Sequence, residues 1–340
     1  MGQKIIEIKN SFGNELLILG HHYQTDEVLN YCDARGDSFE LAKIASTTPA
    51  SKIIFCGVHF MAETADIITN DEQKVFIPDP TAGCSLADCA NIDEIESVWK
   101  IITSKTDKKI IPITYINSTA AIKAFTGKHE GLVCTSSNAE KALKKALELG
   151  DKVFFFPDQF LGYNTAIKMG FDRNTIKLWM KDSPGLTTQN IQDGKILLWD
   201  GYCCVHQEFS TNYIKYLRKT YEGIKIIAHP ECHYTICEKS DYTGSTKKII
   251  EVIEQSTPGS IWGVGTEKHL VNRLQKEHPD KEIYFLEDYE PECVSMMKIT
   301  VPKLLYLMEH LKNGKEINRV IVDKSTASEA LLALNRMLEL

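Results

Sequence analysis

The chain has 340 residues, of which 43% are hydrophobic and 25% are charged, the composition of a soluble globular protein with a large core. Its 39 basic and 46 acidic residues leave a net charge of −7, which disfavours a nucleic-acid partner because phosphate contacts need a basic face. No apolar run approaches the roughly 20 residues of a membrane span, and the first residues lack the apolar core of a secretory signal. We therefore expect a cytoplasmic protein of two or three domains, with neither a membrane nor a nucleic-acid partner.

Short apolar runs alternate with helical patterns along most of the chain, which indicates an α/β fold of parallel sheets and crossover helices. Three runs have similar surroundings, Q-K-V-F-I-P-D-P, D-K-V-F-F-F-P-D and D-K-E-I-Y-F-L-E-D, and they recur roughly every 80 to 130 residues. Two further strands are expected before each of them, so the pattern predicts three copies of a small α/β/α unit. The expected strands are residues 16–19, 53–56, 75–77, 110–114, 131–134, 153–156, 196–199, 224–228, 260–264 and 282–286.

Polar side chains gather directly after these strands, where parallel sheets bind their ligands. His, Tyr, Asn, Ser, Glu and Cys recur at one strand end after another, which is a distribution typical of enzymes. The segments are G-H-H-Y-Q (20–24), G-V-H-F-M-A-E-T-A-D (57–66), P-D-P-T-A-G-C-S-L-A-D (78–88), T-Y-I-N-S-T-A-A-I-K-A (114–124), C-T-S-S-N-A (134–139), W-D-G-Y-C-C-V-H-Q-E-F (199–209), A-H-P-E-C (228–232) and T-G-S-T-K-K-I-I (243–250).

The ten cysteines are unusual for a chain with no sign of export, because the cytosol keeps thiols reduced and disfavours a disulfide framework. No C-x2-C pair occurs, so zinc ribbons and thioredoxin-like redox motifs are poorly supported. A metal site would have to gather thiolates from distant segments. Taken singly, each cysteine is also explained as a small buried hydrophobic residue.

Three segments have the form of a helix start after a strand end, at Ser38, at Ser136 and at Ser245–Thr246. Ser38 is expected to cap the first helix, and Ser245 or Thr246 the third. Free N–H groups and hydroxyls at a helix N-terminus bind anions, although ordinary capping explains each segment alone. In H-P-E, His229 and Glu231 are expected to point to one side of an extended chain. They suit proton transfer next to a carbonyl group, or they form a structural pair.

Taken together, G-H-H-Y-Q, G-D-S-F-E-L-A, G-V-x-F-M-A-E-T-A, P-D-P-x-A-G-C-S-L-A-D, T-Y-I-N-S-T-A-A-I-K, C-T-S-S-N-A, F-x-P-D-Q-x-L-G, W-D-G-Y-C-x-V-H, H-P-E-C, G-S-T and C-V-S-M-M-K-I-T resemble the quinolinate synthase family, also called quinolinate synthetase A. The resemblance runs from about Leu17 to Thr300, and these motifs in this order are very specific to the family. One stretch, F-T-G-K-H-E between Tyr115 and Ser136, departs from the family pattern and is expected to be a surface insertion.

The resemblance implies three similar α/β/α sandwich domains with parallel sheets, in a pseudo-threefold arrangement around a central active site. The domains are expected at 1–100, 101–195 and 196–312, followed by a C-terminal segment with a helix at 313–340. The family binds a 4Fe-4S cluster through three cysteines and leaves one iron open as a Lewis acid. The resemblance assigns these ligands to Cys84, Cys203 and Cys293. Cys203 is preferred over its neighbour Cys204 because His206 then follows the ligand by three residues, as in the family.

The implied reaction joins iminosuccinate (iminoaspartate) to dihydroxyacetone phosphate and gives quinolinate, phosphate and two waters, a step of NAD biosynthesis. It involves no net oxidation, and a functional link to the enzyme that makes iminosuccinate from aspartate is expected. By resemblance, Glu231 is the main proton-transfer group, and Tyr23 and His206 assist it. The expected substrate-binding residues are His21, Ser38, Tyr115, Asn117, Ser136, His229, Glu231 and Thr246.

Two other functions fit many of the same features. An iron–sulfur hydro-lyase acting on a hydroxy acid would share the three thiolates and the open iron. A non-catalytic metal-binding regulatory protein would share only the ligands, and the many polar strand ends argue against it.

Overall fold

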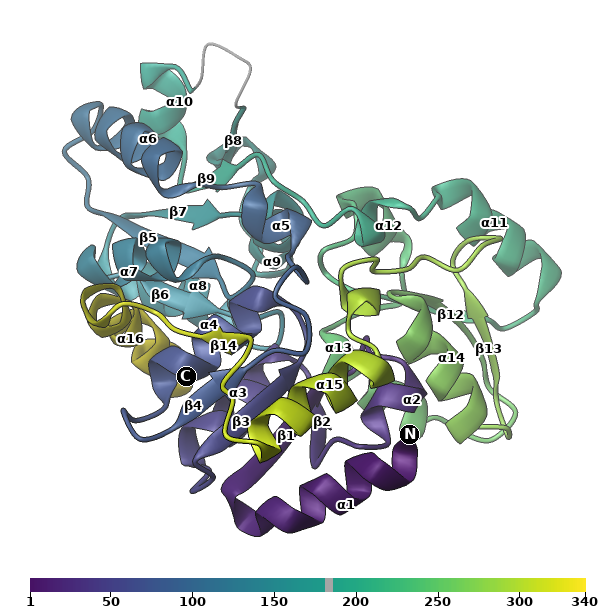
Figure 1. Cartoon of the computed structure of the whole chain (residues 1–340). Helices are drawn as coiled ribbons and strands as arrows, with labels where there is room; N and C mark the ends of the chain where they lie inside the picture. Colours follow the sequence, from purple (N-terminus) through teal and green to yellow (C-terminus); the bar gives the residue numbers. More distant parts are fainter. Residues whose placement is uncertain (181–185) are drawn as a thin grey trace.

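The computed structural model describes residues 1–180 and 186–340, which contain three predominantly parallel sheets flanked by helices (Figure 1). We call them sheets A, B and C in chain order. This is the α/β architecture that the sequence predicts, and the three sheets surround a common centre. The exact domain boundaries stay a prediction.

Sheet A has the strand order β14-β4-β3-β1-β2, in which only β14 (Arg319–Val320) is antiparallel to its neighbour. Its parallel strands are β1 (Leu16–His21), β2 (Ala34–Gly36), β3 (Lys52–Cys56) and β4 (Lys74–Phe76). The helices of this stretch are α1 (Gly2–Phe12), α2 (Asp26–Leu29), α3 (Ser38–Thr47), α4 (His59–Ile68), α5 (Ser85–Asp88) and α6 (Ile92–Ser104).

Sheet B has the order β6-β5-β7-β9-β8 and is wholly parallel. Its strands β5 and β7 are buried along their whole length, as expected of parallel strands covered on both faces. The strands are β5 (Ile110–Tyr115), β6 (Leu132–Cys134), β7 (Lys152–Phe156), β8 (Ile176–Trp179) and β9 (Ile196–Trp199). The helices are α7 (Ala120–Lys128), α8 (Ala139–Leu149), α9 (Gln159–Lys168) and α10 (Thr188–Asp193).

Sheet C has the order β11-β10-β12-β13 and is also parallel. Its strands are β10 (Lys225–Ala228), β11 (Tyr242–Thr243), β12 (Ile261–Gly265) and β13 (Glu282–Phe285). The helices are α11 (Thr211–Thr220), α12 (Tyr234–Lys239), α13 (Thr246–Glu254) and α14 (Lys268–Glu277). Two C-terminal helices follow, α15 (Val301–Lys312) and α16 (Lys324–Leu338).

The same strand order recurs in the three sheets, because the first strand always lies between the second and the third: β2-β1-β3, β6-β5-β7 and β11-β10-β12. All ten predicted strands are present. The predicted repeat treated β4, β7 and β13 as equivalent strands, which was wrong for sheet B. β7 lies directly beside β5, the first strand of its unit, whereas β4 and β13 lie one strand further out, beside β3 and β12. The mismatch arose because the short strands β2 and β11 carry too few residues for a recognisable pattern.

The hydrophobic cores of sheets A and B are continuous. The buried residues of sheet C form two further clusters that are separate from this core. Helix α16 fills the junction of sheets A and B, packing on α7, β6 and α4. At Gly127 the two helices approach so closely that a Cβ atom would lie 1.8 Å from the carbonyl oxygen of Glu329. The stretch F-T-G-K-H-E is therefore no surface insertion, because Phe125, Thr126 and Gly127 are buried, with Phe125 packed against Trp99 and Gly127 against α16.

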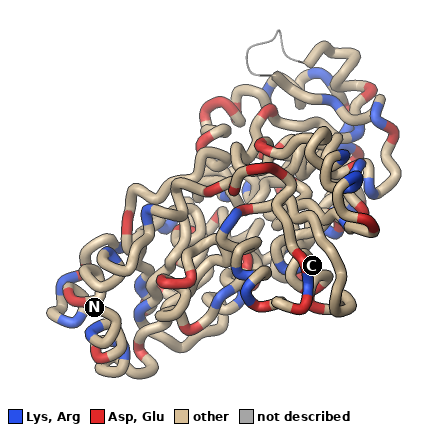
Figure 2. The backbone as a smooth tube through the Cα atoms, turned by 90° about the vertical axis from the view of Figure 1, so that its right-hand side faces the viewer, with Lys and Arg blue, Asp and Glu red and all other residues tan. Residues whose placement is uncertain are grey.

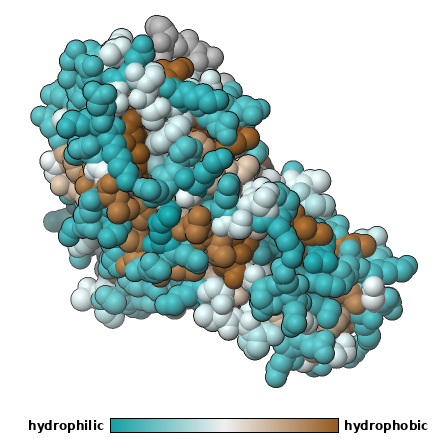
Figure 3. Space-filling model, turned by 90° about the vertical axis from the view of Figure 1, so that its left-hand side faces the viewer, coloured by the Kyte–Doolittle hydropathy of each residue, from teal (hydrophilic) through white to brown (hydrophobic). Residues whose placement is uncertain are grey.

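Basic and acidic residues are intermixed over the side of the molecule seen in Figure 2. The opposite side carries only small groups of hydrophobic residues between hydrophilic ones (Figure 3). Within residues 1–180 and 186–340, no helix combines the length and the apolar content needed to cross a membrane.

Candidate active site

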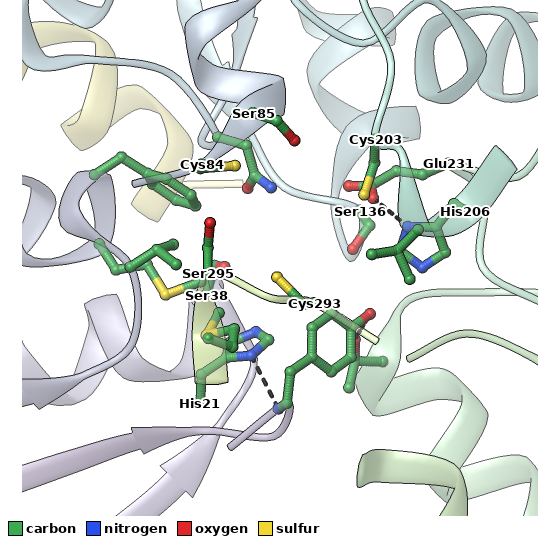
Figure 4. A pocket seen from close by; sticks show the side chains of 18 of the residues that line it. His21, Ser38, Cys84, Ser85, Ser136, Cys203, His206, Glu231, Cys293 and Ser295 are labelled. Atoms are coloured by element: carbon green, nitrogen blue, oxygen red, sulfur yellow. Dashed lines mark hydrogen bonds and ion pairs between the residues drawn. The ribbon is translucent and has the colours of Figure 1, made fainter. Parts of the chain in front are cut away.

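A cavity of about 190 Å³ lies where loops of the three units meet (Figure 4). Every site residue predicted from the sequence lines it, although their roles stay predictions. These residues are His21, Tyr23, Ser38, Cys84, Tyr115, Asn117, Ser136, Cys203, His206, His229, Glu231, Thr246 and Cys293. The pocket also has an apolar wall, formed by Val58, Phe60 and Met61.

Three thiols, those of Cys84, Cys203 and Cys293, point toward the middle of this cavity (Figure 4). Burial raises the pKa of Cys84 to about 12, and the neighbouring Cys293 adds to the rise. Burial likewise raises the pKa of Cys203, with further contributions from Glu231, Cys84 and Cys293. Burial also raises the pKa of Cys293, to about 11. Because the three thiols face one cavity, a cationic centre placed there could bind all of them as thiolates.

Cys204 also lines the cavity, but it is exposed and its Sγ lies 3.5 Å from the hydroxyl of Ser85. Cys203 is instead half-buried, and its Sγ lies within 4.8 Å of ligand atoms of His206 and Glu231. The preference for Cys203 stays a prediction.

Glu231 is the buried carboxylate of the site, and its Oε2 lies 2.7 Å from Nδ1 of His206. The segment H-P-E is a turn after β10 and not the extended chain expected, but His229 and Glu231 still face the same cavity, 3.8 Å apart. Burial alone would raise the pKa of Glu231, but the two imidazoles and the Tyr115 hydroxyl outweigh it and lower the value to about 2. Burial lowers the pKa of His229 to about 3, so this ring is neutral near pH 7.

A chain of hydrogen-bonding groups connects Glu231 to Tyr23. His206 Nε2 lies 3.2 Å from the hydroxyl of Thr266, and that hydroxyl lies 2.9 Å from the hydroxyl of Tyr23. Thr266 is fully buried. Sequence reasoning missed it, although it directly follows the predicted strand at 260–264 and so stands at the kind of position where the other candidates were found.

The capping residue differs from the prediction at α3, whereas at α13 it is one of the two residues predicted. Asp37, and not Ser38, caps α3 in a capping box, and Ser245 caps α13. Within residues 1–180 and 186–340, the hydroxyls of Ser38 and Ser136 make no hydrogen bond, and that of Thr246 contacts only Tyr23, at 3.3 Å. Because Asp37 and Ser245 cap α3 and α13, the hydroxyls of Ser38 and Thr246 are not needed as caps and can bind an anion, as can that of Ser136 before α8.

Two further buried oxygen atoms lack partners among the described residues, one in the wall of the cavity and one outside it. Asn117 Oδ1 has no hydrogen-bond donor although the residue lines the cavity. Asp158 is fully buried and caps α9 through Oδ1, whereas its Oδ2 is unpaired. Burial, and then the charge of Glu231, raise the pKa of Asp158 well above its usual range.

Chemically, the arrangement joins thiol ligands, a buried carboxylate in a chain of hydrogen-bonding groups, and hydroxyls at helix starts. Such a site can bind a multiply charged anion, hold a metal centre beside it, and move protons between a carbon atom and an oxygen atom.

Comparison with known proteins agrees with this chemistry. The family model described as quinolinate synthetase A protein matches residues 3–339. The chain is 47% identical to the quinolinate synthases of Bacillus cereus and Bacillus cytotoxicus over 341 residues, covering 100% of this chain and 93% of each relative. It is also 47% identical to the quinolinate synthase of Anoxybacillus flavithermus, covering 99% of this chain and 93% of the relative.

Proposed function

The chain belongs to the quinolinate synthetase A family of enzymes, and from this premise we propose that it condenses iminosuccinate with dihydroxyacetone phosphate to give quinolinate, phosphate and two waters. The observation that carries the proposal is the convergence of Cys84, Cys203 and Cys293 from the three units on one cavity that also contains Glu231. Iminosuccinate is an imine that water hydrolyses, so the enzyme that makes it from aspartate would have to supply it close by, in the cytoplasm.

The three thiols that face the cavity fit a 4Fe-4S cluster, because the cluster of this family is bound by three cysteines and needs no fourth. Cys84, Cys203 and Cys293 would hold the cluster. When bound, the cluster supplies an open iron as a Lewis acid for a substrate oxygen.

Glu231 would act as the base that removes a proton from the carbon next to a carbonyl group. Its ionised state suits this role, because the hydrogen bonds from His206 and Tyr115 stabilise the carboxylate. Asn117 Oδ1 would accept a hydrogen bond from the substrate, since it has no donor in the described part of the protein.

Each loss of water takes a proton from carbon and a hydroxyl group from its neighbour. Glu231 would take the proton, and the Tyr23 hydroxyl would protonate the departing hydroxyl group. His206 and Thr266 would hold Glu231 and Tyr23 in place relative to each other, because each successive pair of groups is 2.7 to 3.2 Å apart. Glu231 would release its proton to solvent, and Tyr23 would regain a proton from solvent, before the next loss of water.

The hydroxyls of Ser38, Ser136 and Thr246 would bind the phosphate or carboxylate groups of the substrates, with the helix dipoles favouring negative charge. His21 would serve beside them as a neutral ligand, because burial lowers its pKa to about 3.

The variant Glu231→Gln tests the proposed base, since it keeps the shape of the side chain but removes its basicity. We expect turnover to fall roughly 100-fold or more, the scale of losing a positioned base, while iron content stays normal. Glu222→Gln, an exposed change in the same unit, is the matched control and should leave turnover unchanged. Near-normal turnover in Glu231→Gln would contradict the proposal and show that His229 and Glu231 form only a structural pair.

A further inference from the structure

The segment between β1 and α2 belongs to the unit of sheet A, but two of its backbone carbonyls accept hydrogen bonds from a residue in the unit of sheet C. The amide of His22 donates to Gly36, and that of Gln24 donates to His21, so these amides are paired within their own unit. In the described part of the chain, the carbonyls of His22 and Gln24 accept a hydrogen bond only from Arg273 of α14.

Arg273 has an exposed fraction of 5%, and all three of its nitrogen atoms are engaged. Nη1 donates to the carbonyl of His22 at 2.8 Å and Nη2 to the carbonyl of Gln24 at 2.7 Å, while Nε donates to Asp26 Oδ1 at 2.7 Å. The guanidinium is a planar fork, so binding two carbonyls and a carboxylate together fixes their relative positions. A lysine has a single point charge and cannot hold all three acceptors in this geometry.

Tyr23 is the residue between the two held carbonyls. Its hydroxyl contacts Thr246 and Thr266, which also belong to the unit of sheet C. The carbonyls on both sides of Tyr23 and its hydroxyl are therefore held by a unit other than its own, whereas its amide donates to Nδ1 of His21 at 3.1 Å.

We propose that Arg273 is a positioning residue that holds the backbone on both sides of Tyr23, so that the Tyr23 hydroxyl meets Thr266 and the substrate. This inference rests on the proposed role of Tyr23 as the proton donor. Arg273 does not line the cavity, so it acts only through Tyr23.

The test compares Arg273→Lys, Arg273→Gln, Tyr23→Phe and the double variant Arg273→Lys/Tyr23→Phe in the cluster-loaded enzyme. Lys276→Met is the matched control, because Lys276 pairs with the same Asp26 from the same helix but is 70% exposed. Iron content and thermal midpoint are measured beside kcat and KM for dihydroxyacetone phosphate.

We expect Arg273→Lys to lower kcat about tenfold or more, because a small misplacement of a catalytic group has effects of this size. The KM, the iron content and the activity of Lys276→Met should stay near the starting values. The decisive result is the cycle: the double variant should be no slower than Tyr23→Phe alone, within about twofold.

Additive losses in the double variant would overturn the proposal, as would normal kcat in both Arg273→Lys and Arg273→Gln. Failure of Arg273→Lys to fold would also overturn it, because this variant keeps the buried charge and its collapse would make Arg273 a structural residue. A normal kcat in Tyr23→Phe is a different outcome, since it would refute the proposed role of Tyr23 itself.

Discussion

Helix α16 presents Ala330, Ala333 and Leu334 to the junction of sheets A and B, and all three side chains are fully buried. Helix α14 instead faces the unit of sheet A with Arg273 and Lys276, which make hydrogen bonds and ion pairs. The first junction is an extension of the hydrophobic core, whereas the second is a set of directional polar contacts.

The two junctions therefore serve different purposes: the first stabilises the fold and the second fixes positions. Apolar contacts are non-directional and supply most of the free energy of folding, so sheets A and B form one stable body. Hydrogen bonds to charged groups add less free energy but fix positions, and the unit of sheet C is held in this way. Further polar links between the same two units support this interpretation: Lys247 pairs with Glu40, and Arg35 pairs with Glu277.

The largest loss of stability is expected from Leu334→Ala, which leaves a cavity at the junction of sheets A and B. We expect the free energy of unfolding to fall by about 2 to 5 kcal/mol, the range for a fully buried leucine. Urea denaturation followed by circular dichroism measures this change. Turnover per folded molecule should be unchanged, because Leu334 does not line the cavity.

Leu332→Ala on the same helix provides the control, because its side chain is 49% exposed and the change should stay within about 0.5 kcal/mol. Equal effects of the two variants would show that α16 does not carry the apolar junction.

A smaller effect is expected from Asp26→Asn at the polar junction. Burial alone would raise the pKa of Asp26, but the hydrogen bonds from Lys276 and Arg273 outweigh it and hold the pKa below its ordinary value of 3.8. The carboxylate therefore stabilises the folded protein above pH 3.8, and this contribution is lost as the pH falls through the lower folded pKa. Because the side chain is 39% exposed, solvent screens the pair and we expect a loss of only about 1 kcal/mol at pH 7.

Thermal unfolding of both proteins between pH 7 and pH 3 checks this prediction. The advantage of the unchanged protein over Asp26→Asn should shrink as the solution is acidified below pH 3.8. An advantage that is constant or grows on acidification would contradict the sign of the pKa shift.

The sequence was sufficient to predict what depends on local pattern. The long apolar strands were found because burial on both faces leaves a continuous hydrophobic run, as in β7. The segments that carry the site were found because polar groups follow such runs, whereas the individual site residues were assigned from the resemblance to the quinolinate synthase family. Strands β2 and β11 were missed because they are very short.

What the sequence could not predict depends on contacts between distant segments. Gly127 is buried only because α16 returns to pack against α7 some 200 residues later, and nothing in F-T-G-K-H-E indicates that. From the sequence, Arg273 cannot be distinguished from the other charged residues of an amphipathic helix. Its three partners lie about 250 residues earlier in the chain. Ser38 was expected at a cap because a serine beside Asp37 serves equally well there, and only the capping box decides between them.

The central claim is that this cavity joins the two proposed substrates without consuming electrons. Its most direct test is an anaerobic assay of the iron- and sulfide-loaded protein with iminosuccinate and dihydroxyacetone phosphate, with quinolinate and phosphate both quantified and no reductant added. We expect quinolinate and phosphate to appear in equal amounts over many turnovers. No quinolinate from a fully loaded protein, or turnover of a hydroxy acid alone without the triose phosphate, would contradict it.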